Sequence, residues 1–200
     1  MANTSRVQGL RPINQPFGGI RANWYEAATG VAFYRNQPVD KDTNGRVVAA
    51  TAGSGNYILG SVLALGDDEF GPPRDSTSGY IGANPASANS AGIINVLVAD
   101  DPAQWFLLEE DTGGAALDSL ARGLGVNFAT QALAGNTKTG VSTAVLDRST
   151  VIAGSSQQFR IIKKWDKPDN AYGDYCKWIV MPFYHRYNPS NAEAARTTLQ

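Results

Sequence analysis

Few residues in this sequence could perform chemistry, and none has a partner at a catalytic spacing. His185 is the only histidine and Cys176 the only cysteine, so a histidine metal cluster and an internal disulfide are both excluded. We interpret His185, which lies near the end of a strand-like run, as a structural or surface residue. Cys176 lies in the same run and is interpreted as a small buried hydrophobe. The sequence contains neither a phosphate-binding glycine loop nor a serine nucleophile elbow.

Carboxylates occur in three runs, at residues 67–69, 100–101 and 109–111. Neighbouring acids on a strand point to opposite faces of the sheet. No run has the alternating oxygen ligands and the glycine that a calcium loop requires. We therefore predict solvated turns and caps for all three. A glycosidase pair from distant positions stays open as an alternative, since the fold sets that separation. The leading prediction is no enzyme, no cofactor and no metal site.

The composition allows two interpretations of the surface. Charged residues make up 18% of the 200 residues, below the roughly 25% of an ordinary soluble domain. This fits either a small neutral protein or one that buries its outside against partners. A net charge of −1 with scattered basic residues argues against nucleic-acid binding. No apolar run long enough to span a membrane and no signal peptide is present, so we expect folding in a reducing cytoplasm.

Short strand-like segments separated by turn residues predict an all-β fold, an antiparallel sandwich or barrel with long loops and at most one short helix, over 115–121. Residues 157–165 alternate in polarity, and residues 175–187 are apolar on both faces, so we expect the second strand to be covered on both sides. Asn44-Gly45 predicts a tight turn, and Gly60, in the middle of the strand-like run 57–65, predicts a bulge or a close approach. Residues 92–110 form the clearest predicted hairpin.

The predicted organisation has three parts. Residues 1–28 form an extended N-terminal arm, residues 29–188 a β-rich domain, and residues 189–200 a frayed tail. The β-rich domain is either one unit or two subdomains with a break near 112–140. The irregular segment 67–91 is predicted to be a binding loop. The arm is either a floppy terminus or a strap on a neighbouring subunit, whose predicted interface residues are Val7, Leu10, Arg11, Ile13 and Phe17.

A series of segments occurs in an order shared with a known group of proteins. The segments are Ala2-Asn3-Thr4 with Gly9-Leu10-Arg11-Pro12, Gln37-Pro38-Val39, Asn44 to Val48, Ile58 to Val62, Val96 to Pro102, Trp105 to Asp111, and Pro168-Asp169-Asn170 with Tyr172-Gly173. Together they resemble the capsid decoration (cement) proteins of tailed bacteriophages. The resemblance spans residues 3–186.

This resemblance implies a structural function. Proteins of this kind sit on the outer surface of the phage head as oligomers and lock major capsid protein subunits together. The implied partners are the major capsid protein and further copies of this chain, with a homotrimer favoured over a homodimer, and the implied location is the virion. Two alternatives stay open, a head-fibre or tail module and a carbohydrate-binding or hydrolytic β-protein. The latter would use one of the four tryptophans, Trp24, Trp105, Trp165 and Trp178, as a stacking platform.

Overall fold

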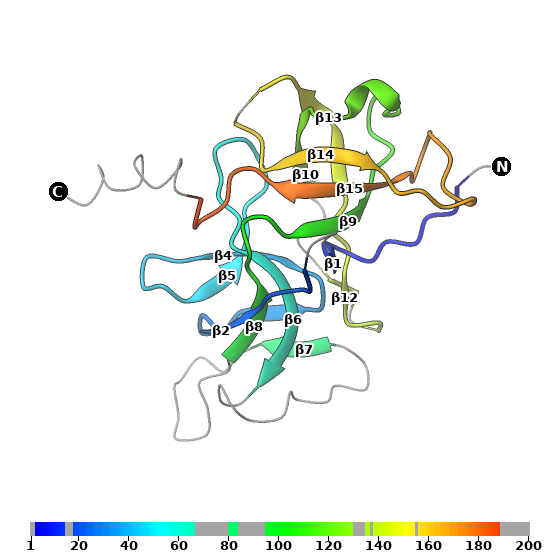
Figure 1. Ribbon diagram of the computed structural model, residues 1–200. Helices are drawn as coiled ribbons and strands as arrows, with labels where there is room; N and C mark the ends of the chain where they lie inside the picture. Colours follow the sequence, from blue (N-terminus) through cyan, green and yellow to red (C-terminus); the bar gives the residue numbers. More distant parts are fainter. Residues whose placement is uncertain are drawn as a thin grey trace.

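Two antiparallel β-sheets packed together dominate the structure, which confirms the predicted all-β class (Figure 1). The structure is a computed structural model that describes residues 3–14, 18–66, 80–83, 95–129, 135–136, 138–154 and 156–188, with 80–83 described by backbone only. In Figure 1 the larger sheet lies above the smaller one. The two sheets are built from different parts of the chain. The smaller sheet comes mainly from the first half and the larger sheet mainly from the second half.

The larger sheet has six strands, and the aromatic-rich C-terminal strand lies near its middle. Its order is β1 (Arg11–Ile13), β9 (Trp105–Glu109), β15 (Lys177–Pro182), β14 (Phe159–Lys164), β10 (Gly125–Phe128) and β13 (Leu146–Ile152). Three consecutive residues of β15, Trp178, Ile179 and Val180, are all buried although they alternate between the two faces. The strand predicted to be covered on both sides is therefore confirmed.

The smaller sheet has five strands in the order β2 (Asn23–Glu26), β8 (Asn95–Ala99), β6 (Gly60–Gly66), β4 (Pro38–Lys41) and β5 (Val47–Ala49). The predicted turn at Asn44-Gly45 joins β4 to β5, and Gly45 adopts a φ of +82°. Gly60 allows β6 to approach β8 closely, because a Cβ at this position would lie 2.0 Å from the carbonyl oxygen of Ala99. The glycine predicted to mark a bulge or a close approach does the latter.

Smaller elements decorate these sheets. β3 (Ala32–Tyr34) pairs with β7 (Tyr80–Ala83), and β11 (Gly135–Asn136) pairs with β12 (Val141–Ser142). The helix predicted over 115–121 is one 3₁₀ turn, η1 (Ser119–Ala121), whose first turn is capped by the Asp118 side chain. The predicted binding loop 67–91 lies outside the described residues except for β7, and the tail 189–200 lies outside them entirely.

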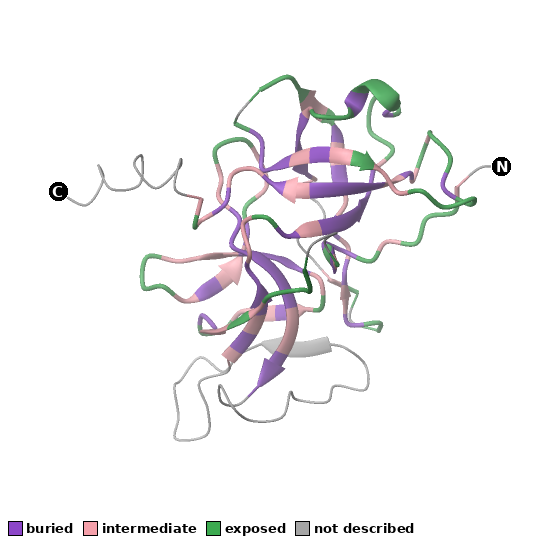
Figure 2. Ribbon diagram, in the orientation of Figure 1, coloured by how far each residue is buried: buried purple, intermediate pink, exposed green. Residues whose placement is uncertain are grey.

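Two hydrophobic clusters form the core, as the buried colouring of the strands in Figure 2 indicates. The larger cluster lies on the six-stranded sheet and includes Phe106, Phe128, Phe159 and Trp178, together with Ile58 from the segment before β6. The smaller cluster lies on the five-stranded sheet and is built around Phe33 and a set of valines and leucines. Apolar contacts of this kind supply most of the folding free energy.

The hairpin predicted over 92–110 is wrong. β8 pairs with β2 and β6 in the smaller sheet, whereas β9 pairs with β1 and β15 in the larger one. The turn at Asp100–Gln104 carries the chain from one sheet to the other. Both strands are apolar enough to be covered by neighbours on two sides, so their pattern could not distinguish a hairpin from a crossing. The change of sheet also lies upstream of the predicted subdomain break near 112–140.

Candidate interaction surface

The residues with catalytic potential are engaged in structural contacts. His185 is fully buried, and its Nε2 lies 2.7 Å from the carbonyl oxygen of Leu59 while Nδ1 accepts the backbone N–H of Tyr187 at 3.0 Å. Burial lowers the pKa of His185 and raises that of the Cys176 thiol to about 12. Cys176 is buried, as predicted. Among the described residues, no three His, Cys, Asp or Glu side chains gather closely enough to hold a metal ion.

The prediction that the acidic runs form solvated turns and caps is wrong for three of their residues, whereas Asp101 does cap its turn by accepting the Ala103 N–H at 2.8 Å. Asp100, Glu109 and Glu110 are buried. Glu109 and Glu110 do point to opposite faces, because Glu109 accepts hydrogen bonds from the N-terminal segment while Glu110 faces Arg148 and Trp178. Asp100 accepts from Asn23 Nδ2 at 2.9 Å and from the hydroxyl of Tyr25. Each carboxylate is buried because distant donors satisfy it. The run 67–69 lies outside the described residues.

Glu110 is the centre of a buried charged cluster. Its Oε2 accepts from Trp178 Nε1 at 2.8 Å, and its Oε1 lies 3.4 Å from Arg148 Nη1. Arg148 also donates to Asp174 and to the carbonyl oxygens of Thr112 and Gly113. Burial raises the pKa of Glu110 to about 7, although the bonds from Trp178 and Arg148 oppose that rise. Because each guanidinium nitrogen of Arg148 has an acceptor inside the fold, we assign this cluster to stability.

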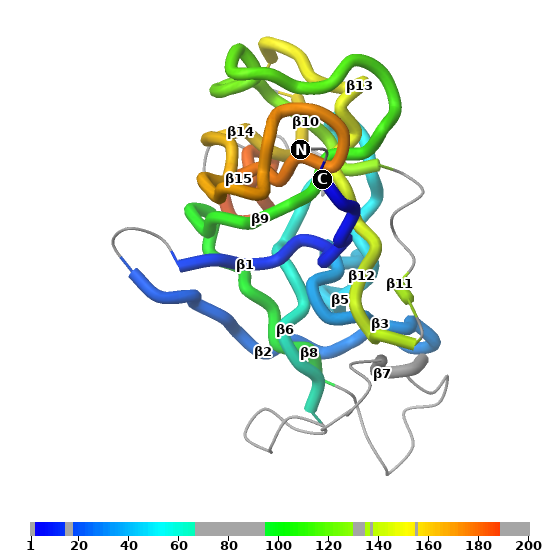
Figure 3. The backbone as a smooth tube through the Cα atoms, turned by 90° about the vertical axis from the view of Figure 1, so that its right-hand side faces the viewer, coloured from blue at the N-terminus to red at the C-terminus, as the bar shows by residue number. Residues whose placement is uncertain are grey.

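The N-terminal segment is bound to the body of the protein along its length (Figure 3). The Asn3 side chain donates to the loop at Ala171–Asp174, and both oxygens of Glu109 accept from Ser5 Oγ and the Arg6 backbone N–H at 2.9 Å. Residues 11–13 then pair with β9 as strand β1. In this structure the predicted arm 1–28 thus contributes one strand to each sheet, residues 11–13 to the six-stranded sheet and residues 23–26 to the five-stranded sheet.

The predicted interface residues have different environments. Leu10 is fully buried in the larger core, its N–H donates to Asn36 O at 2.7 Å, and its carbonyl accepts from Ser61 Oγ at 2.6 Å. It is therefore not available to a second molecule. Val7 and Ile13 are half-buried, and Arg11 is exposed. Phe17 lies outside the described residues.

An open groove of about 610 Å³ lies where the N-terminal segment passes the rest of the chain. Val7 and Arg11 line it, together with the exposed Ile20 and Arg35 and the half-buried Leu63. The groove therefore combines apolar side chains with two guanidinium groups, and the described residues of its lining include no carboxylate. Such a surface suits a partner that offers acidic and apolar groups together.

Sequence reasoning identified Val7 and Arg11 but missed Arg35, Leu63 and Val141, which also line the groove. Arg35 and Val141 meet through an isolated bridge between segments more than a hundred positions apart. Leu63 lies in an apolar strand and has no feature in the sequence that marks it as half-buried. A local pattern could not have found either contribution.

Comparisons with known proteins give no relative for this chain. No protein-family model, no curated protein and no solved structure matches it. No helix in the described part of the chain is long and apolar enough to cross a membrane.

Proposed function

We propose that this protein is a virion structural protein, a decoration (cement) protein that binds the outer surface of a tailed-phage head and stabilises contacts between major capsid protein subunits. The observation that carries the proposal is the ordered series of segments that resembles this group, from Asn3 to the 168–173 turn. The groove of Val7, Arg11, Ile20, Arg35 and Leu63 supports it as a surface of suitable chemistry.

The physical task of such a protein is to raise the cost of separating neighbouring subunits. A seam under pressure from packaged DNA opens less readily when a rigid protein bridges it. The bound N-terminal segment favours this task, because a groove formed by fixed strands loses little entropy on binding. Several copies in a homotrimer would act together through effective concentration. The two arginines would contact acidic patches on the shell.

The test uses phage heads that lack this protein and purified full-length protein added back to them. We expect saturable co-sedimentation, hundreds of copies per particle, and a higher temperature for DNA release. A dozen or fewer copies would favour a head-fibre or tail module instead. No binding to the heads would overturn the proposal.

Charge reversal tests the groove within the same assay. We expect Arg11→Glu with Arg35→Glu to weaken binding to the heads at least about tenfold, since each reversal replaces attraction with repulsion. Arg122→Glu is the matched control, because Arg122 is also an exposed arginine but does not line the groove. Deleting residues 1–20 would be a poor test, since it removes Leu10 from the core and β1 from the sheet.

A further inference from the structure

Two segments singled out in the sequence, Asn3-Thr4 and residues 168–173, meet at a pocket whose lining shares no residue with the groove. The Asn3 side chain donates to Ala171 O at 2.8 Å and to Asp174 O at 2.9 Å, and it accepts the Ala171 N–H at 2.9 Å. These three bonds join residues about 170 positions apart. They place the N-terminal segment beside the loop between β14 and β15.

The pocket has a fixed frame. Asn170 is buried, and its amide donates to the carbonyl oxygens of Trp165 and Lys177 at 2.8 and 2.9 Å. Its Oδ1 accepts the Lys177 backbone N–H at 2.8 Å. Because Asn3 and Asn170 use their side chains to hold the backbone, the positions of the other lining residues are set before any ligand arrives.

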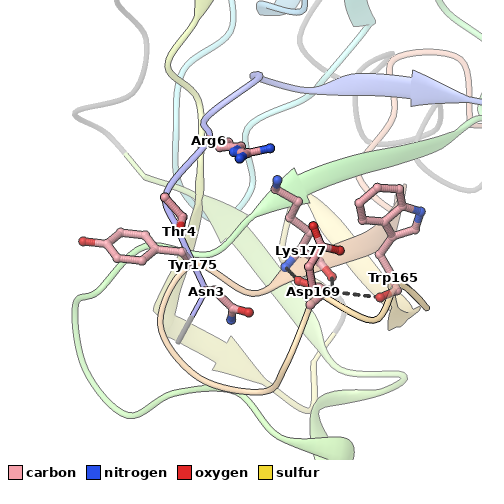
Figure 4. A pocket seen from close by; sticks show the side chains of 8 residues that line it. Asn3, Thr4, Arg6, Trp165, Asp169, Tyr175 and Lys177 are labelled. Carbon is pink, nitrogen blue, oxygen red and sulfur yellow. Dashed lines mark hydrogen bonds between the residues drawn. The ribbon is translucent and has the colours of Figure 1, made fainter. Parts of the chain in front are cut away.

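The remaining lining residues present functional groups to a cavity of about 200 Å³. They are Thr4, Arg6, Trp165, Asp169, Tyr175 and Lys177. In Figure 4 the Arg6 and Lys177 side chains point toward one another, while Trp165 and Tyr175 stand on opposite sides of the group. The set offers cationic donors, a carboxylate acceptor, the Thr4 hydroxyl and the Trp165 ring around one small volume, whereas the Tyr175 ring extends away from the other labelled side chains.

Carboxylates near Arg6 and Lys177 weaken the attraction of the pocket for an anion. Asp169 lines the pocket itself, and Glu109 lies beside Arg6 and Lys177 in an adjoining depression. Both oxygens of Glu109 already accept hydrogen bonds from the N-terminal segment. Two cations against two carboxylates leave no net charge, so a simple anion gains little here.

Tyr175 adds an observation of a different kind. Its φ of +62° is unusual for a bulky residue. Such a conformation costs on the order of 1–3 kcal/mol and persists where the surroundings impose it. The strained residue lies in the lining of the pocket. Strain of this kind clusters at binding sites, which supports a role for the pocket.

We propose that this pocket binds a single pyranose ring of a glycan. The cavity is smaller than the roughly 300–1,000 Å³ of pockets for drug-sized ligands. A sugar presents both donors and acceptors on its hydroxyls, which matches a lining that holds Arg6, Lys177 and Asp169 together. Its C–H face would stack on Trp165, because aromatic side chains combine large contact area with fixed geometry. This inference is independent of the proposed function, since the assay below contains no capsid.

The experiment measures binding of the purified full-length protein to a glycan array and follows amide and indole NMR signals during titration with methyl glycosides. The glycosides are those of glucose, galactose, N-acetylglucosamine and glucuronic acid, with acetate as the probe for simple anion binding. We expect at least one glycoside to shift the Trp165 indole signal and those of Thr4 and Lys177, while acetate leaves them unchanged.

Two variants with matched controls locate the site. Trp165→Ala and Lys177→Met should each weaken binding of that glycoside at least about tenfold. Trp24→Ala and Lys163→Met, which change a half-buried tryptophan and an exposed lysine outside the pocket, should change it less than about twofold. Thermal unfolding checks that each variant folds, and Lys177→Met decides the matter if Trp165→Ala does not.

Three results would overturn the proposal. The first is the absence of any glycan signal on the array and in the titrations. The second is an acetate response as large as that of the glycosides, which would identify an anion site. The third is glycoside binding that persists unchanged in Lys177→Met.

Discussion

Each sheet packs against a fully buried group that titrates, an acid in one region and a base in the other. Against the six-stranded sheet lies an acid, Glu110, fully buried with Arg148 and Trp178. Against the five-stranded sheet lies a base, His185, whose ring contacts the carbonyl oxygen of Leu59 just before β6. Burial opposes charge in both, raising the pKa of the acid and lowering that of the base. The two regions should therefore respond to pH in opposite directions.

The two regions also differ in how they hold their arginines. Arg148 in the six-stranded sheet is buried and donates to two carboxylates and two carbonyl oxygens. Arg186, beside β4 of the five-stranded sheet, pairs with Asp40 and keeps 30% of its side chain exposed. A buried pair leaves an uncompensated charge when one member is lost, whereas water replaces a lost exposed partner. We therefore expect the loss of Arg148 to cost more stability than the loss of Arg186.

The largest expected effect comes from Arg148→Met. Removing the guanidinium strands Glu110 in the core and should lower the free energy of unfolding by about 3–5 kcal/mol at pH 8. The matched variant Arg186→Met should cost about 1 kcal/mol or less. Urea unfolding followed by tryptophan fluorescence measures both. Equal losses of unfolding free energy in the two variants would show that the two arginines do not differ in their contribution to stability.

Leu10→Ala tests whether the N-terminal segment belongs to the core of the six-stranded sheet. Leu10 is fully buried, so the truncation should lower the free energy of unfolding by about 2–5 kcal/mol. Ile20→Ala is the control, because Ile20 is 39% exposed and should change stability by only about 0.5 kcal/mol. A negligible loss from Leu10→Ala would mean that the segment is detached in solution.

The pH dependence separates the two buried groups. The pKa of Glu110 is raised to about 7, above the roughly 4.3 of an unfolded glutamate. Its contribution is therefore complete below pH 4.3 and is lost as the pH rises through 7. The contribution of His185 to stability has the opposite pH dependence, because burial lowers its pKa. Its contribution is complete above the unfolded pKa of about 6.5 and declines as the pH falls below it.

Glu110→Gln should expose the histidine response alone. In the original protein the titration of Glu110 should lower the free energy of unfolding by on the order of 2 kcal/mol between pH 5 and pH 8. We expect this fall to be absent from the variant. What remains is the rise in stability with pH that His185 produces. Urea unfolding at half-unit pH intervals measures the two curves. Parallel curves for the variant and the original protein would show that Glu110 does not titrate in this range.

The smallest expected effect is that of Tyr175→Gly. Glycine relieves the positive φ of this position but loses the partly buried ring and gains freedom in the unfolded chain. These contributions oppose one another, so the free energy of unfolding should change by less than about 1 kcal/mol. Thermal unfolding tests this, and a loss comparable to that of Arg148→Met would show that the ring is part of the core.

Local patterns in the sequence determined the all-β class, the turn at Asn44-Gly45, the close approach at Gly60 and the double coverage of the strand that holds Trp178. Each of these depends on residues adjacent along the chain, whose side chains alternate or whose φ is restricted. The tertiary structure alone decided the partners. Glu109 is buried because Ser5, 104 residues away, supplies a donor, and β8 and β9 separate because each finds better neighbours in a different sheet. Whether a charged side chain is buried, and which strands pair, depends on groups that lie far away in the sequence. A local sequence pattern does not contain this information.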